Sequence, residues 1–308
     1  HMTSFRSLSP LKQSGILLTL GLLIFGFADN LTLLVSDQVS VGQFHFSRSL
    51  CAICIVLVFA RFSGAQIFPK NWNAVFARAF FNVVAMLLYF GVIPMMPIAE
   101  AGAGLFTSPV FILLFSYILF RENISKRQIF SFLLGLLGVS LILGNDYTNI
   151  SIYHIFPVLA GASYAMGAIV TNKYLKDEDP VAILLSFLFS IGVVGLLLTV
   201  FFTVYPVEKT YLIEAPFIFR PWSNPGYFFW AVMIFLGFTS SLAIYLMIKA
   251  YQISRPSYAA IYEYTYLISA GFFSWLFWGS VPTFASFCGI IAIVLAGINI
   301  IIAKGTQD

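Results

Sequence analysis

The stretch GILLTLGLLIFGFADNLTLLV, residues 15–35, is followed closely by QFHFSRSLCAICIVLVFA, residues 43–60. A membrane-spanning helix needs about 20 mainly apolar residues, so both runs predict helices that cross a bilayer. Asp29 interrupts the first run and Arg48 the second. Because a charge at the centre of such a helix costs roughly 2.5–3.5 kcal/mol on insertion scales, we expect both side chains to face protein or a water-filled cavity. They are therefore the first functional candidates.

The composition excludes a soluble domain. Of the 308 residues, 60% are hydrophobic and only 9% are charged, whereas a soluble domain has about 25% charged residues. The net charge of +4 is small, and the basic residues are scattered among short connections, which makes nucleic acid an unlikely partner. The chain is predicted to be an all-α, polytopic membrane protein with the lipid bilayer as its surroundings.

The same length criterion predicts ten membrane-spanning helices along the chain. They are expected at residues 15–35, 43–60, 73–93, 98–120, 127–144, 152–172, 181–204, 226–249, 257–279 and 283–303. Polar or turn residues mark the short joints between them, and the exception is a long connection at 205–225.

The basic residues divide between the two sides of this arrangement. One side receives Arg6, Lys12, Arg61, Lys70, Arg78, Arg121, Lys126, Arg127, Lys173, Lys176, Lys249, Arg255 and Lys304. The other side receives Lys209 and Arg220. By the positive-inside rule the first side is cytoplasmic. We therefore expect both termini inside the cell, the long connection outside, and the protein in the inner (plasma) membrane.

Two parts of the chain share a layout, which predicts an internal repeat. In residues 99–143 and 256–301 a helix of small and aromatic residues is followed by a short joint and a helix with spaced glycines. The chain is thus expected to form two five-helix repeats, 11–145 and 152–304, within one membrane unit. An odd number of helices per repeat inverts the second one. Inverted repeats are typical of transporters that work by alternating access around a midplane site.

Several short strings resemble a known family. They are Phe27-Ala28-Asp29-Asn30, Phe46-Ser47-Arg48-Ser49-Leu50, Pro109-Val110-Phe111, Phe120-Arg121-Glu122 and Gln128. With the ten spans and the duplication, they resemble the drug/metabolite transporter superfamily, EamA type, over the whole chain. The resemblance implies metabolite transport, most commonly export. The second repeat departs from the first, with Tyr266 and Gly279 in place of Pro109 and Glu122.

Asp29, His45 and Arg48 form the first candidate site. Arg48 can hold a carboxylate or phosphate through its forked donors, while Asp29 can take a proton or an ammonium group. His45 lies three residues before Arg48 on the same helix face and titrates in a range that suits a proton relay. The alternative is structural, with Asp29 and Arg48 as a buried ion pair and His45 as an interfacial residue.

The ninth predicted helix carries the second candidate site. Tyr258, Tyr262 and Tyr266 recur every four residues and form one stripe, with Glu263 beside it. An acid among tyrosines is suited to an organic cation, through charge and ring faces. The alternative is aromatic helix packing, with Glu263 hydrogen-bonded to tyrosine hydroxyls.

Three more polar residues within apolar runs are candidates for the substrate cavity: Asn82, Tyr89 and Tyr164. Asn82 is expected near mid-depth, where interhelical hydrogen bonding leaves room for a ligand. Arg78, near a helix end, is interpreted as a side chain that extends to the membrane surface.

Small residues and a proline in the fourth predicted helix are candidates for a hinge. Gly102 and Gly104 allow close approach of backbones, and Pro109 frees a carbonyl and permits a kink. Tight packing without motion is the alternative for each glycine.

The sequence contains no hydrolase, nucleotide-binding or metalloprotease motif. We therefore predict no enzymatic activity, cofactor or metal ion, and no need for an oligomer. The prediction is a secondary-active carrier for a small-molecule substrate, an amino acid or similar zwitterion, with export favoured and candidate proton coupling. The alternatives are an uptake carrier for a larger cationic or nucleoside-like metabolite, and, from another class, a channel.

Overall fold

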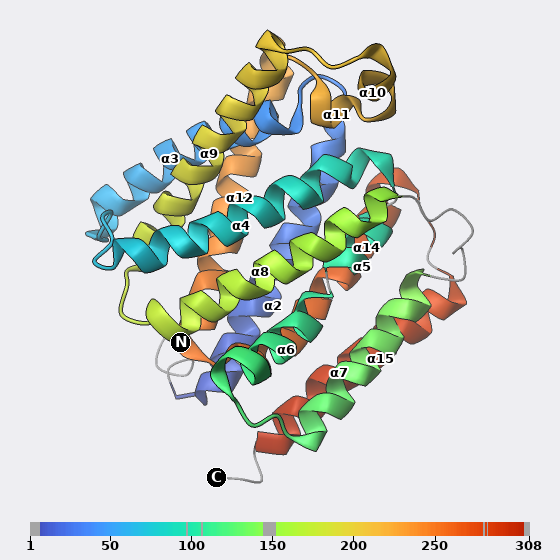
Figure 1. Cartoon of the computed structure of the whole chain (residues 1–308). Helices are drawn as coiled ribbons and strands as arrows, with labels where there is room; N and C mark the ends of the chain where they lie inside the picture. The colour runs from blue at the N-terminus through green and yellow to red at the C-terminus, as the bar shows by residue number, and fades with distance from the viewer. Residues whose placement is uncertain are drawn as a thin grey trace.

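A computed structural model describes residues 7–96, 98–105, 107–143, 152–279, 281 and 283–304, and these residues form helices and connections without a β-strand (Figure 1). The α-helices are α2 (Pro10–Leu31), α3 (Val41–Ser63), α4 (Trp72–Val92), α5 (Ile98–Leu105), α6 (Ser108–Phe120), α7 (Lys126–Leu143), α8 (Ile155–Tyr174), α9 (Pro180–Val204), α10 (Lys209–Glu214), α11 (Pro216–Phe219), α12 (Tyr227–Ile253), α13 (Pro256–Ala259), α14 (Thr265–Trp278) and α15 (Phe284–Lys304). Short 3₁₀ helices are η1 (Thr32–Leu34), η2 (Ile93–Met95), η4 (Ile152–His154) and η5 (Ala260–Tyr264).

Within the described part of the chain, six helical stretches are long and apolar enough to cross a membrane. They are Pro10–Leu34, Val41–Ser63, Trp72–Met95, Ile152–Tyr174, Pro180–Val204 and Tyr227–Ile253. Ser108–Phe120 and Phe287–Asn299 are shorter apolar helices. The chain is therefore a multi-pass, all-α membrane protein.

Two segments that the sequence predicts as single helices are broken. In the segment at 98–120, α5 ends at Leu105 and α6 begins at Ser108. Pro109 lies in the first turn of α6 and has no N–H with which to continue a helix from the preceding turn. In the segment at 257–279, the 3₁₀ helix η5 separates α13 from α14. A 3₁₀ stretch inside a helical segment often marks a hinge.

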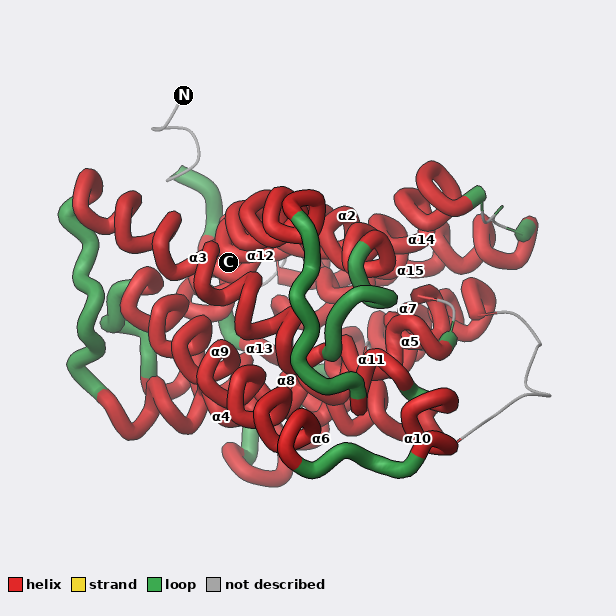
Figure 2. Tube along the Cα trace, turned by 90° about the horizontal axis from the view of Figure 1, so that it is seen from above, coloured by secondary structure: helices red, strands yellow, loops and turns green. Residues whose placement is uncertain are grey.

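The helices form two layers that meet at both edges, as Figures 1 and 2 show. In one layer α2 packs between α12 and α14, and α12 also contacts α3. In the other layer α8 packs between α4 and α6, and α4 also contacts α9. The pair α3–α9 joins the layers at one edge, and the pair α7–α15 lies at the other. The polar residues of interest lie between the layers.

Apolar side chains cover the outside and polar ones lie inside, the reverse of a soluble protein. Leu197 on α9 is 62% exposed and Phe80 on α4 is 63% exposed, whereas Asp29, Arg48 and Glu263 are buried. A lipid environment accounts for this distribution, because apolar surface needs no burial there and charged groups avoid the hydrocarbon.

Glycines let helices from the two layers approach closely. A Cβ on Gly195 of α9 would lie 2.5 Å from the Gly42 carbonyl oxygen of α3. At the other edge, a Cβ on Gly138 of α7 would lie 2.6 Å from the Gly289 carbonyl oxygen of α15. Both pairs of helices are thus in backbone contact, the arrangement that small residues permit in membrane proteins.

We predict that Gly195→Ala lowers the thermal stability of the detergent-solubilised protein, because the added methyl group must push α3 and α9 apart. Overpacking of this kind costs about 1–3 kcal/mol. Gly271→Ala is the matched control, since a Cβ on Gly271 of α14 would meet nothing within 4 Å. Alanine there should leave the melting temperature unchanged or raise it, because alanine favours helix by up to about 1 kcal/mol. The melting temperatures are measured by circular dichroism. An equal decrease in melting temperature for the two variants would contradict the close contact between α3 and α9.

Candidate functional site

Asp29 lies near the end of α2 and is held by tyrosines from the facing helices. Its Oδ2 accepts a hydrogen bond of 2.6 Å from the Tyr266 hydroxyl of α14. Tyr266 in turn makes a short hydrogen bond with the Tyr89 hydroxyl of α4. All three residues are at most 2% exposed. We call Asp29, Tyr89 and Tyr266 the aspartate cluster.

Arg48 and Asp29, both described in the structure, do not approach within the 4.0 Å of an ion pair. The Arg48 Nη2 and the His45 Nδ1 are 3.1 Å apart, and the guanidinium lies over the rings of Phe44 and Phe90 at 5.1 and 5.0 Å. In this conformation Asp29 and Arg48 therefore form no direct ion pair, although the two charges lie close enough for a Coulombic interaction. The reason is that tyrosine already satisfies Asp29, while aromatic faces surround Arg48.

Glu263 belongs to η5 and forms a second centre of the same kind. Its Oε1 accepts hydrogen bonds from the Tyr164 hydroxyl of α8, at 2.8 Å, and from the Tyr251 hydroxyl of α12. Glu263 is 1% exposed. We call Glu263, Tyr164 and Tyr251 the glutamate cluster. The prediction missed Tyr251, which lies just beyond the predicted span 226–249, between Lys249 and Gln252, where a tyrosine is typical of a helix end at the membrane surface.

Arg78 is buried, which corrects its interpretation as a side chain reaching the membrane surface. It is 6% exposed, its Nε donates to Thr171 Oγ1 of α8 at 2.8 Å, and its Nη1 has no hydrogen-bond partner. Asn82 donates to the Arg78 carbonyl at 2.9 Å. Because Arg78 stands four residues before Asn82, the two share a helix face. The four-residue spacing between Arg78 and Asn82 is the feature of the sequence from which the inward orientation of Arg78 could have been predicted.

Two small cavities lie between the layers and bring these groups together. One, of about 20 Å³, is lined by Phe25, Arg78, Asn82, Met86, Tyr164, Ala168, Thr171, Phe187, Ile244, Met247 and Tyr251. The other, of about 30 Å³, is lined by Leu22, Phe25, Ala85, Met86, Tyr89, Leu105, Tyr164, Met247, Glu263 and Tyr266. They share Phe25, Met86, Tyr164 and Met247. We refer to them together as the central site, and each has room for about one or two waters.

Several predicted site residues lie apart from the central site. Arg48, His45, Tyr258 and Tyr262 are not among the residues that line its two cavities. Asp29 does not line them either, but it contacts the lining residue Tyr266. The expected stripe of tyrosines is divided because the segment is not one continuous helix. Tyr262 packs its ring against Gly15 of α2, where a Cβ would lie 2.7 Å from it.

The predicted hinge residues border the break between α5 and α6. A Cβ on Gly102 would lie 3.1 Å from Leu267 and from the Tyr266 ring, and one on Gly104 would lie 2.4 Å from Pro157. Pro109 is buried at the start of α6. Both glycines therefore serve close packing here, one of them against the aspartate cluster.

Polar contacts close the molecule at both ends of the helices. At the end that carries α10 and α11, at the top of Figure 1, Arg220 Nη1 donates to the carbonyls of Ser36 and Val39 at 3.1 and 3.0 Å. At the opposite end Lys173 Nζ lies 2.7 Å from Glu122 Oε1, and Ser257 donates to Glu122 Oε2 at 3.2 Å. These contacts tie together segments that are far apart in the chain at each end of the molecule.

Known proteins support a transporter and not an enzyme. A pseudopaline exporter of Pseudomonas aeruginosa is 22% identical over 289 residues, which cover 93% of this chain and 95% of the exporter. An S-adenosylmethionine uptake transporter of Rickettsia prowazekii is 23% identical over 280 residues, 89% of this chain and 85% of that transporter.

A solved crystal structure shares the fold, with a TM-score of 0.75, 14% identity, and coverage of 96% of this chain and 99% of that one. The model of the EamA-like transporter family matches residues 13–144 and 151–302. This match confirms the resemblance to EamA-type drug/metabolite transporters. The chain belongs to the EamA-like transporter family.

Proposed function

We propose that this protein is a secondary-active carrier for a small zwitterionic metabolite such as an amino acid, with the central site as its binding site. The observation that carries the proposal is the combination there of opposite charges, Arg78 with an unpartnered Nη1 and Glu263 without a basic partner in the described residues. A zwitterion supplies the missing partner for each. Arg78 meets its carboxylate and Glu263 its ammonium group.

This assignment replaces Arg48 by Arg78 as the carboxylate-binding residue. Arg48 already has His45 and two aromatic faces as neighbours and lines neither cavity. Arg78 lines one of them, beside Asn82 and Tyr164. Tyr89 and Tyr266 line the other cavity, and Tyr266 links Tyr89 to Asp29, which lies behind this wall.

A larger cationic or nucleoside-like metabolite is the second candidate. It is favoured by the presence of two buried carboxylates, Asp29 and Glu263, each held by tyrosine hydroxyls. A cation can replace these hydroxyls as the partner of the carboxylates and contact the tyrosine rings. Relatives named for export and for uptake leave both directions open to this family, and we favour export.

The proposed architecture has ten membrane-spanning segments in two inverted repeats, 11–145 and 152–304, in the inner membrane with both termini cytoplasmic. The repeats pair α2 with α8, α3 with α9, α4 with α12, α6 with α14 and α7 with α15. This pairing exchanges the two layers of the fold. In one layer α2 packs against α12 and α14. In the other layer its counterpart α8 packs against α4 and α6, which are the counterparts of α12 and α14. Such symmetry supports inverted repeats.

The proposed mechanism is alternating access with this conformation as a substrate-free intermediate, since the two cavities have room for only about one or two waters each. Interrupted helices at corresponding places of two repeats are typical of the substrate sites of transporters. Here the α5–α6 break and η5 occupy such places, and Glu263 lies in η5. Opening one end requires loss of the Arg220 contacts, and opening the other requires loss of the Lys173–Glu122 pair. A channel would need both ends open together.

We predict that small zwitterions raise the melting temperature of the purified protein and that Arg78→Gln and Glu263→Gln weaken their binding roughly 10- to 100-fold. That range follows from the loss of a hydrogen bond to a charged group, about 1.5–3 kcal/mol. The measurement is a thermal-shift titration with a panel of amino acids, organic cations and nucleosides. Ligand binding at 100 times the dissociation constant stabilises the native state by about 2.7 kcal/mol.

Arg61→Gln is the matched control, because Arg61 is exposed at the end of α3. The Arg61→Gln variant should show the same rise in melting temperature with zwitterions as the wild-type protein. Arg48→Gln should weaken zwitterion binding less than Arg78→Gln does. If organic cations alone stabilise the protein, and the response depends on Glu263 but not Arg78, the second candidate replaces the first.

We predict that transport in liposomes responds to an imposed pH step and that Asp29→Asn removes this response while substrate counterflow persists. Asparagine keeps the hydrogen bond from Tyr266 but cannot exchange a proton. His45→Gln should retain the response, because the side-chain partner of His45 is Arg48, whereas Asp29 is bonded to Tyr266, which lines a cavity. Counterflow separates coupling from binding, since it needs no proton gradient. A wild-type protein that ignores the pH step would exclude proton coupling, and single-channel currents would exclude the carrier itself.

A further inference from the structure

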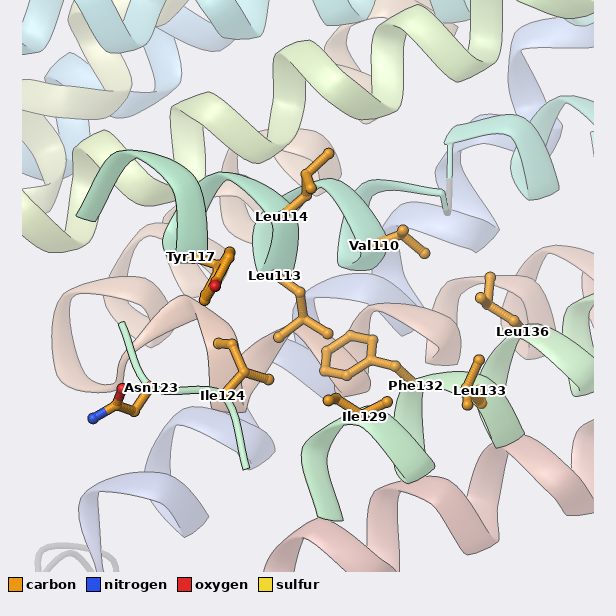
Figure 3. A pocket seen from close by; sticks show the side chains of 10 residues that line it. All are labelled: Val110, Leu113, Leu114, Tyr117, Asn123, Ile124, Ile129, Phe132, Leu133 and Leu136. Atoms are coloured by element: carbon orange, nitrogen blue, oxygen red, sulfur yellow. The ribbon is translucent and has the colours of Figure 1, made fainter. Parts of the chain in front are cut away.

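A large apolar groove lies outside the central site, between α6 and α7 (Figure 3). Its volume is about 540 Å³, and its walls are Val110, Leu113, Leu114, Tyr117, Asn123, Ile124, Ile129, Phe132, Leu133 and Leu136. Leu113, Ile129 and Phe132 face one another in the middle of the groove. Leu114, Tyr117 and Leu133 are 45, 65 and 60% exposed, so the groove opens on the outer, lipid-facing surface of the protein.

The two walls are stripes of helical residues that both lead to a basic side chain. On α6 the stripe ends at Tyr117, and Arg121 follows four residues later, with its amide donating to the Tyr117 carbonyl at 3.1 Å. On α7 Lys126 precedes Ile129 by three residues and therefore lies on the same face. Arg121 and Lys126 are both exposed. Tyr117 and Asn123 lie at one end of the groove, and Arg121 and Lys126 belong to the connection from α6 to the start of α7 that contains Asn123.

No acidic group within this loop offsets these two cations. Glu122 lies between them in sequence, but its carboxylate pairs with Lys173 at 2.7 Å and accepts from Ser257. The mouth of the groove is thus positively charged, while the groove itself is apolar. An anionic phospholipid has a charged headgroup that matches the basic mouth and apolar chains that match the groove. Basic pockets between membrane helices on the cytoplasmic side bind such headgroups.

We propose that the groove between α6 and α7 binds one acyl chain of an anionic phospholipid, with Arg121 and Lys126 holding its phosphate. The length supports a lipid from one leaflet. From Lys126 to Leu136 the helix rises about 15 Å, half of the roughly 30 Å thickness of the hydrocarbon core. The inference is independent of the transported substrate, because no residue of the groove lines the central site.

The test compares phosphatidylglycerol with phosphatidylcholine of the same acyl chains, each titrated into the purified protein in mild detergent. Bound lipid is counted by native mass spectrometry. We expect phosphatidylglycerol to bind more tightly, and Arg121→Asn and Lys126→Gln each to reduce this preference about fivefold. Asparagine is chosen because Arg121 has a φ of 51°, a left-handed conformation that asparagine tolerates.

Two further variants separate charge from shape. Leu133→Trp fills the groove from an exposed position and should reduce the retention of both lipids with both cations intact. The double variant Arg61→Gln/Lys176→Gln removes two exposed basic residues away from the groove and should preserve the preference. Equal binding of the two lipids, or a preference that survives loss of both groove cations, would overturn the proposal. So would a dimer that forms through this face and excludes lipid.

Discussion

Two buried carboxylates that hydrogen-bond to tyrosines and form no direct ion pair are the constraint on which the described structure depends. Asp29 and Glu263 are at most 2% exposed, and tyrosine hydroxyls are their observed donors. In an apolar interior an unmade hydrogen bond to such a group is far more costly than in water. The helices that supply the tyrosines therefore cannot separate unless water or a ligand replaces the tyrosine hydroxyls as hydrogen-bond donor, or a proton neutralises the carboxylate. Closure of the molecule is in this way coupled to what occupies the central site.

The break in the ninth predicted helix places both clusters under one element. Glu263 lies in η5, and Tyr266 lies in the first turn of α14, directly after it. Tyr266 reaches Asp29 on α2, while Glu263 meets Tyr164 of α8 and Tyr251 of α12. A small rotation at η5 would change the contacts of both carboxylates at once. If substrate binds as we propose, this arrangement gives a physical route from binding at one cluster to rearrangement at the other.

The groove between α6 and α7 uses the opposite chemistry on the outer face. Its walls are apolar and its mouth is basic, whereas the central site is polar and enclosed. The loop of Arg121 to Lys126 also contains Glu122, whose pair with Lys173 closes one end of the molecule. A lipid phosphate held by these cations would therefore lie close to a contact that breaks in the alternating access proposed above.

The sequence by itself determined the membrane class, the helical fold, the family and several residues of the site. Apolar length was sufficient for the membrane class and the helices, while the family came from the resemblance of short residue strings. Polar side chains within apolar runs pointed to Asp29, Asn82, Tyr89, Tyr164, Glu263 and Tyr266 as inward-facing. Only the tertiary structure shows which side chains are hydrogen-bond partners of one another. Tyrosine and not Arg48 satisfies Asp29, Arg78 turns inward beside Thr171, and Tyr251 completes the glutamate cluster. Helical periodicity fixes a face within one helix, but which faces meet depends on packing between helices far apart in the chain.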